Sequence, residues 1–262
     1  MVYAMYVFRK RQKSKLKSKL EWQKLREYLI KPSYDHSIAR QLACSNLLWP
    51  IIRAYSNSPY SEEYDRVNAI FIHIPKNAGI AMQRTLSVSD TLVGHKCLLN
   101  YKIYDPLRFK KYKKIAFTRN PYARLISTYK FICQGGVDGK EKAIQDWRDK
   151  NLSHIRDFRE FVYKLENPSF ARIVLNQKHF CPQWRWISDE TGKIDIDFLG
   201  SVENFHEDIQ KLCQQLDLPV PNQVKVKNSS GGHKTDNYYN GSMKQIVQVK
   251  YKHDFELLGY PA

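Results

Sequence analysis

The pattern of apolar and polar residues predicts an α/β protein in which buried strands alternate with helices. Residues 69–74 form an almost continuous apolar run rich in β-branched side chains, which is typical of a strand inside a parallel sheet that is covered on both faces. Residues 115–118 have the same character. The segment that begins at Ile194 predicts a third strand and then a helix, one face of which carries Phe205, Ile209, Leu212, Cys213 and Leu216.

The clearest helix start follows the strand at residues 115–118. Asn120 is a favourable N-cap, and Pro121 suits the first helical position, where its missing N–H costs nothing. We expect Arg124, inside this helix, to be solvated or ion-paired. The apolar stripe at i, i+3, i+4 and i+7 indicates core packing and consists of Tyr122, Leu125, Ile126 and Tyr129.

Further helices are expected on both sides of these elements. Helical spacing predicts a core-facing helix within residues 153–165 and a final helix that runs from Ser242 towards Tyr260 and packs on the sheet. Loop composition at residues 56–63 places the start of the main domain near residue 65. We therefore divide the chain into a basic helical N-terminal extension, residues 1–64, and a domain, residues 65–262.

A lysine-bearing turn, Lys76-Asn77-Ala78-Gly79, joins the first predicted strand to a helix. Backbone N–H groups at a helix start, beside an ammonium group, indicate an anion site, although such a turn can also be purely structural. A nucleotide kinase is the other obvious interpretation. Its phosphate loop needs two glycines bracketing four residues and then Lys and Ser or Thr, whereas here Lys76 precedes the single glycine and Ala81 has no hydroxyl for magnesium.

Two motifs together resemble the donor-binding motifs of a known enzyme family. The run from Phe71 to Gly79 resembles the 5′-phosphosulfate loop of sulfotransferases that use 3′-phosphoadenosine 5′-phosphosulfate (PAPS). Residues 119–129 resemble the family's 3′-phosphate motif, Arg-Asn-Pro-Tyr-x-Arg-Leu-x-Ser-x-Tyr, at every fixed position. The likeness is strongest to carbohydrate O-sulfotransferases of the heparan sulfate 2-O-sulfotransferase-like type (sulfotransferase family 2). It implies a P-loop-like three-layer α/β/α fold with a central parallel sheet.

The resemblance also implies roles for particular residues. Lys76 would neutralise the leaving phosphate oxygen, while Arg119 and Ser127 would hold the 3′-phosphate of PAPS, the product being 3′-phosphoadenosine 5′-phosphate (PAP). A basic, glycine-rich loop would close over the nucleotide. The remaining residues expected to bind the donor are Asn77, Ala78, Gly79, Ile80, Ala81, Lys227, Ser229 and Lys234.

Sulfuryl transfer to an alcohol needs a base that takes the hydroxyl proton, and the ordinary pKa of histidine lies near working pH. In relatives a Gly-His pair between the two phosphate motifs supplies it, which points to His95 after Gly94. His73 and His179 compete for this role, and His73, which alternates with core residues, is expected to be structural or loop-orienting. Residues 179–183 resemble a His-x-x-Pro-Gln element that lies near the acceptor side of the family's cleft. The residues expected to contact the acceptor are therefore His179, Gln183, Trp184 and Arg185. The alternative is that this segment is an aromatic loop packed in the core.

We expect no metal site at the acidic residues near the third strand. Asp195 and Asp197 have a spacing that a metal pair could have, but we expect them to be solvated at the strand edge, since sulfuryl transfer in this family needs no metal. Glu203 is expected either to buttress the site or to cap the following helix.

The charge of the chain predicts anionic partners. The formal net charge is +17, and residues 9–31 contain ten basic against two acidic residues. We interpret this segment as a solvated appendage, with anionic lipid or an acidic glycan acceptor as the alternative partner. The motifs indicate a charged nucleotide and a saccharide rather than nucleic acid.

Five scattered cysteines predict neither a zinc site nor a disulfide framework. The sequence has no apolar run of membrane-spanning length, so we expect a bacterial cytoplasmic enzyme, either free or peripheral to a membrane, unless the sequence is a truncated Golgi enzyme.

Two functions remain open. The first is a carbohydrate sulfotransferase. The second is a catalytically impaired basic module that binds an anionic glycan or nucleic acid. The second gains support from Ile80 and Ala81, which replace hydroxyl residues that relatives usually carry after the loop glycine.

Overall fold

A small parallel sheet organises the computed structural model, which describes residues 57–85, 94–220 and 235–262. Its strands are β1 (Ala69–Ile72), β2 (Lys113–Thr118) and β3 (Phe198–Ser201), in the order β1-β2-β3. Ile72 pairs with Ala116, and Thr118 pairs with Ser201. The predicted α/β class and the parallel sheet are confirmed.

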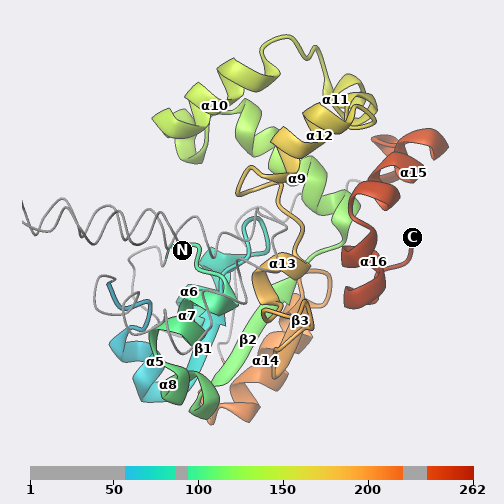
Figure 1. Ribbon diagram of the computed structural model, residues 1–262. Helices are drawn as coiled ribbons and strands as arrows, with labels where there is room; N and C mark the ends of the chain where they lie inside the picture. Colours follow the sequence, from blue (N-terminus) through green and yellow to red (C-terminus); the bar gives the residue numbers. More distant parts are fainter. Residues whose placement is uncertain (1–56, 86–93, 221–234) are drawn as a thin grey trace, which may run out of the picture.

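Helices account for most of the remaining described chain. They surround the sheet and form a second group above it (Figure 1). Short 3₁₀ turns lie at η1 (Val137–Gly139) and η2 (Thr235–Asn237). The helices are α5 (Glu62–Val67), α6 (Gly79–Thr85), α7 (Leu98–Tyr104), α8 (Pro106–Lys111), α9 (Pro121–Cys133), α10 (Lys142–Leu152), α11 (Phe158–Lys164), α12 (Pro168–Leu175), α13 (Trp184–Ile187), α14 (Phe205–Gln215), α15 (Gly241–Lys250) and α16 (Lys252–Leu258).

Two hydrophobic cores lie on either side of the sheet's carboxyl edge. The first is built around β1 and β2, with α7 and α14 packed against them. The second is built from α9, α11, α12, α15 and α16. Helix α9 starts three residues after β2 and runs from the sheet into the helical part (Figure 1). Residues at the start of α9 are therefore held by both parts of the molecule.

The start of α9 confirms the predicted cap. The Asn120 side-chain oxygen accepts hydrogen bonds from the backbone N–H groups of Tyr122 (3.0 Å) and Ala123 (3.3 Å), and Pro121 is the first helical residue. These bonds satisfy N–H groups that have no partner inside the helix. The direction in which α9 leaves β2 is thus set by local sequence.

Several predicted boundaries differ from the structure. β3 begins at Phe198 rather than near Ile194, because Ile194 forms an isolated antiparallel bridge with Ser188. The predicted final helix is two helices, α15 and α16, broken at Tyr251, and they pack against α9, α11 and α13 rather than on the sheet. Within residues 153–165 the helix starts only at Phe158.

Asp195 and Asp197 are partly exposed near the start of the strand, as expected, and they are also ion-paired. The Lys114 ammonium pairs with both carboxylates, at 3.5 and 2.9 Å, and Asp197 accepts the Lys114 backbone N–H at 2.8 Å. These contacts therefore fix the residues just before β3 against β2.

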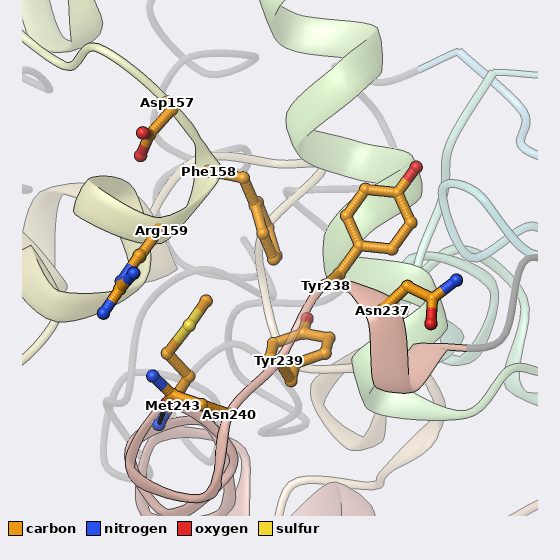
Figure 2. Close-up of a pocket in the computed structure, with 8 residues that line it drawn as sticks. All are labelled: Asp157, Phe158, Arg159, Asn237, Tyr238, Tyr239, Asn240 and Met243. Carbon is orange, nitrogen blue, oxygen red and sulfur yellow. Dashed lines mark hydrogen bonds between the residues drawn. The ribbon is translucent and has the colours of Figure 1, made fainter.

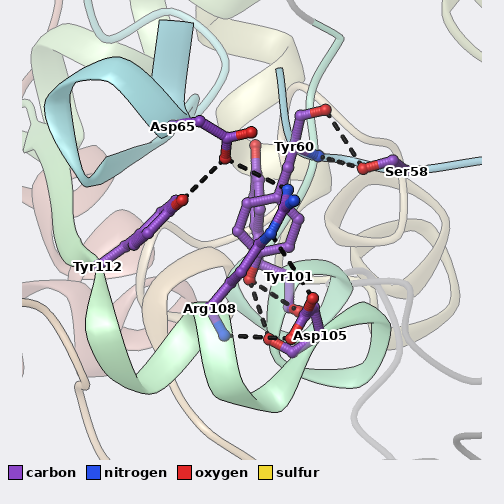
Figure 3. A network of polar contacts seen from close by, with 7 residues as sticks. All are labelled: Ser58, Tyr60, Asp65, Tyr101, Asp105, Arg108 and Tyr112. Carbon is purple, nitrogen blue, oxygen red and sulfur yellow. Dashed lines mark hydrogen bonds and ion pairs between the residues drawn. The ribbon is translucent and has the colours of Figure 1, made fainter. Parts of the chain in front are cut away.

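A polar network secures the region before β2. Tyr112 and Arg108 both bond to the Asp65 carboxylate, at 2.9 and 3.2 Å, and the Tyr60 hydroxyl donates to the Tyr101 carbonyl at 3.2 Å (Figure 3). These bonds join Tyr60 to α7 and α5 to α8, so residues 60–67 pack as part of the fold around the sheet.

Candidate functional site

The two predicted anion-binding turns lie side by side at one edge of the sheet. They follow β1 and β2, which are adjacent and parallel, so both turns emerge at the carboxyl ends of the strands. The Asn77 side chain donates to the Phe117 carbonyl at 2.8 Å, and Arg124 Nε donates to the Pro75 carbonyl at 3.1 Å. The first turn and the proline before it are therefore bonded to both elements that flank the second turn.

The turn of residues 76–79, here called the phosphosulfate turn, has a strained backbone. Lys76 and Ala78 have φ values of 71° and 57°, in the left-handed region that non-glycine residues rarely adopt. Such conformations cost of order 1–3 kcal/mol each and cluster at functional sites. Gly79 is needed for space: a Cβ there would lie 1.8 Å from the Nε2 atom of His73.

Gln183 is the hub between the two turns. Its Oε1 accepts from Asn77 Nδ2 (2.7 Å) and from the Arg119 backbone N–H (2.9 Å). Its Nε2 donates to the Arg119 carbonyl (2.8 Å) and is 3.5 Å from Asp254 Oδ2. The side chain is fully buried and its hydrogen-bonding capacity is used. Gln183 therefore has a structural role in place of the expected acceptor contact. The Asn77 amide nitrogen is likewise used inside the fold, whereas its Oδ1 is buried without a hydrogen-bond partner in the described part of the chain.

Asp254 completes this hub from α16. Its carboxylate accepts the backbone N–H groups of Gln183 and Trp184, each at 2.9 Å, at the start of α13. Burial raises the pKa of Asp254, while Arg124 and the backbone donors oppose that rise. Sequence reasoning missed this residue, because nothing local distinguishes an aspartate 71 positions after Gln183.

Arg124, expected to be solvated or ion-paired, is not solvated. It is 2% exposed, and besides its bond to Pro75 it donates from Nη2 to the His179 carbonyl at 3.0 Å. Thr128 Oγ1 also bonds to that carbonyl, at 3.4 Å. Because α9 passes between both parts of the fold, its Arg124 face packs against the segment around residue 179. Arg124 thus joins the phosphosulfate turn, α9 and this segment.

The site concentrates positive charge. Burial, followed by repulsion from Arg119, lowers the pKa of Lys76 to about 8, and burial also lowers the pKa of Arg119. The Lys76 ammonium lies 4.0 Å from the centroid of the Phe131 ring. Glu141 and Glu203 oppose these shifts only in part. Partly desolvated cations that repel one another favour binding of an anion.

His95 is neutral and carries its ring proton on Nδ1. Its Nδ1 lies 3.1 Å from the His73 carbonyl oxygen, which can only accept, so Nδ1 carries the proton and Nε2 has the free lone pair. Burial, followed by the charge of His73, lowers the pKa of His95 to about 3. The ring is therefore neutral at pH 7 and can take up a proton at Nε2.

The other two histidines are more buried than His95. His73, 8% exposed, packs against Gly79 and holds His95 through its carbonyl, as expected of a loop-orienting residue. His179 is 4% exposed, and its ring centroid is 5.7 Å from that of His95. All three rings lie beside the phosphosulfate turn.

The second turn is supported from the end of β3 and from beyond α16. Glu203 accepts the Asn120 backbone N–H at 2.9 Å and lies 3.2 Å from the Tyr260 hydroxyl, which is 2.9 Å from Thr118 Oγ1. Glu203 therefore buttresses the site and does not cap α14. Ser127 is partly buried on α9, one turn after Arg124.

The remaining predicted site residues are placed as follows. At the start of α13, the Arg185 guanidinium lies 5.6 Å from the Trp184 ring centroid. Ile80 is 43% exposed and Ala81 is buried. Lys227, Ser229 and Lys234 lie outside the described residues, as does most of the basic N-terminal extension.

A separate pocket of about 420 Å³ lies between α11 and the start of α15 (Figure 2). Lys130, on α9, reaches its edge, 2.7 Å from the Tyr238 hydroxyl. The pocket is lined by Asp157, Phe158, Arg159, Asn237, Tyr238, Tyr239, Asn240 and Met243.

Within the described ranges, no group of three histidine, cysteine or acidic residues could hold a metal ion. In the same part of the chain, no helix has both the length and the apolar character needed to cross a membrane.

The profile described as "Sulfotransferase family" matches residues 64–261. The chain belongs to the sulfotransferase family. Carbohydrate sulfotransferase 12 of Xenopus laevis is 26% identical over 174 residues, which are 59% of this chain and 41% of that protein. An uncharacterized protein of Archaeoglobus fulgidus is 28% identical over 130 residues, 50% of this chain and 85% of that protein. No solved structure matched significantly.

Family membership supports sulfuryl transfer as the general type of reaction. The match begins in α5 and ends beyond α16, so it includes both turns, the hub at Gln183 and Asp254. The aligned part spans about two fifths of the Xenopus relative, and the similarity to that carbohydrate sulfotransferase is distant.

Proposed function

We propose that this sulfotransferase moves a sulfuryl group from PAPS to a hydroxyl of a saccharide, with His95 as the general base. One observation carries the proposal. The turn with Lys76 and the turn with Arg119 leave adjacent strands, and a single buried amide, that of Gln183, bonds to both. A nucleotide with phosphates at both ends fits two cationic turns that are fixed side by side.

Different residues would bind the two ends of the donor. Lys76 would neutralise charge on the bridging oxygen as it leaves the sulfur, and backbone N–H groups of the phosphosulfate turn would hold the 5′-phosphate. Arg119 and Ser127 would hold the 3′-phosphate. The remote contact supplies binding energy that positions the sulfuryl group. Ile80 and Ala81 add no hydroxyl, so the 5′ end would rely on backbone donors and Lys76.

The acceptor would approach His95. A hydroxyl bonded to His95 Nε2 would lose its proton as its oxygen attacks sulfur, and the bond to the phosphate oxygen would break on the opposite side. Trp184 and Arg185 offer an aromatic face and a charge that suit a sugar ring. The similarity to carbohydrate sulfotransferase 12 supports a saccharide as acceptor.

The first experiment is calorimetry with PAP, followed by transfer of labelled sulfate from PAPS to a panel of glycans. We expect wild-type binding and a large loss in Arg119→Ala, with no loss in Arg172→Ala, an exposed arginine on α12. Absence of PAP binding, or equal binding by Arg119→Ala, refutes the proposal. Binding without transfer to any glycan would favour the impaired binding module, which the missing hydroxyls at 80 and 81 suggest.

The base is tested separately. His95→Gln keeps the size and polarity of the side chain but cannot accept a proton at pH 7, so transfer should fall by about 100-fold or more while PAP binding is retained. His206→Gln, on the exposed face of α14, is the matched control and should behave as wild type. Undiminished transfer by His95→Gln would assign the base elsewhere.

A further inference from the structure

The ring of His179 is oriented by Gln177. The Gln177 Oε1 accepts the backbone N–H groups of His179 (2.6 Å) and Phe180 (3.3 Å), which identifies it as the amide oxygen. The amide nitrogen then faces His179 Nδ1 at 3.2 Å. Because an amide N–H can only donate, Nδ1 of His179 is the acceptor. The ring proton must therefore be on Nε2.

His95 has the opposite tautomer, since its Nδ1–H donates to the His73 carbonyl. The two rings are close, 5.7 Å between centroids, and nearly perpendicular at 81°. One ring therefore offers an accepting Nε2 and its neighbour a donating Nε2–H. Neither Nε2 has a hydrogen-bond partner among the described residues.

His179 lies on the Lys76 side of this pair. The Phe131 ring contacts both, with the Lys76 ammonium 4.0 Å and the His179 ring 4.9 Å from its centroid. Burial, followed by the charge of Lys178, lowers the pKa of His179 to about 2, and Lys76 adds to this. His179 is thus a neutral donor beside the cation assigned to the leaving oxygen. Its backbone is held by Arg124 and Thr128, independently of the ring.

We propose that His179 donates a hydrogen bond from Nε2 to an oxygen of the sulfuryl group in transit, and that Gln177 is the positioning residue that sets its tautomer. This inference rests on the proposed function. The acceptor proton moves to His95 Nε2, the new oxygen–sulfur bond forms, and the electron pair of the breaking bond goes to the phosphate oxygen beside Lys76. His179 keeps its proton throughout and stabilises charge on the sulfuryl oxygens.

The tautomer is tested first, because this measurement needs no activity. Two-bond ¹H–¹⁵N spectra of the full chain with labelled histidine distinguish protonated from unprotonated ring nitrogens. Spectra of His95→Gln and His179→Gln assign the two signals. We expect the proton on Nδ1 of His95 and on Nε2 of His179, and loss of the His179 preference in Gln177→Leu. A proton on Nδ1 of wild-type His179 overturns the inference even if the enzyme is active.

Kinetics then test the donor. The glutamine amide nitrogen can occupy the position of Nε2, whereas asparagine reaches only that of Nδ1. We expect His179→Gln to keep kcat within about tenfold of wild type and His179→Asn to lose about 10- to 100-fold, since one hydrogen bond to a charged group is lost. Affinity for PAP, which has no sulfuryl group, should be unchanged in both.

Three outcomes would contradict this inference: equal losses in His179→Gln and His179→Asn, weaker PAP binding, or a raised acceptor KM with unchanged kcat. Urea unfolding of each variant shows whether a loss reflects folding. If the wild-type enzyme transfers no sulfate, the proposed function fails while the tautomer assignment stands on the spectra alone.

Discussion

Replacing Lys76 by methionine should stabilise the ligand-free protein while impairing donor binding. The Lys76 ammonium is largely buried, repelled by Arg119 and Arg124, and opposed only by Glu141. Methionine keeps an unbranched apolar side chain that can still pack on Phe131 but brings no charge. The stability of the folded protein and the function of this site are therefore expected to change in opposite directions.

The size of the effect follows from the pKa. Lowering the pKa of Lys76 from 10.5 to about 8 corresponds to about 3 kcal/mol that disfavours the folded state while the lysine is charged. The unfolded chain binds the proton more tightly, so this cost is fully present below pH 8, decreases between pH 8 and 10.5, and is absent above that. Loss of the cation–π contact offsets about 0.5–1 kcal/mol, which leaves a gain of about 2 kcal/mol at pH 7.

Urea unfolding at pH 7 and pH 10 measures this difference. Lys76→Met should be more stable than wild type at pH 7 and nearly equal to it at pH 10. Lys110→Met, an exposed lysine on α8, is the control and should change little at either pH. PAP at 100 times its dissociation constant should add about 2.7 kcal/mol to wild type and much less to the variant.

The reasoning would be refuted if Lys76→Met destabilised the protein at pH 7. It would also be refuted if the gain were the same at pH 10, because a packing effect does not depend on the charge of a lysine.

Three further predictions concern the same site. Gly79→Ala should destabilise the protein by about 1–3 kcal/mol and abolish donor binding, because its methyl group would overlap His73; a stable, binding variant would contradict this, by urea unfolding and calorimetry. Arg124→Met leaves the carbonyls of Pro75 and His179 without this donor and should cost about 2–4 kcal/mol in unfolding free energy; a cost below about 1 kcal/mol would show that they find other partners. In the free enzyme, kcat/KM for PAPS should be level from pH 6 to 7, because the pKa of His95 is about 3, and fall above pH 8 as Lys76 loses its proton; stopped-rate assays should show the alkaline fall disappear in Lys76→Arg, and a fall that persists there would belong to another group.

The parts of the site that could be predicted from sequence are those whose geometry is local. A strand followed by Pro75 or by Asn120-Pro121 specifies where each turn leaves the sheet, and the N-cap of α9 formed as expected. Adjacent parallel strands then bring the turns together without further information.

The parts that could not be predicted depend on contacts distant in sequence. Arg124 lies outside the apolar stripe of α9, so a one-sided helix would expose it, but α9 is packed on more than one side. Gln183 and Asp254 pair across 71 positions, and neither has a sequence neighbourhood that signals the other. The break at Tyr251 was hidden because the apolar spacing continues through Val247, Tyr251 and Phe255, all of them buried.

The placement of Asp254 and Tyr260 also affects how this protein matures. Both turns leave the ribosome more than a hundred residues before α16, yet the hub at Gln183 and the support of Asn120 require residues 254–260. A nascent chain would therefore lack the contacts that support the proposed donor site until residues 254–260 have been synthesised, and contacts so distant along the chain form slowly. A bulky insertion directly behind residue 260 is therefore expected to disturb the contacts that hold Asn120.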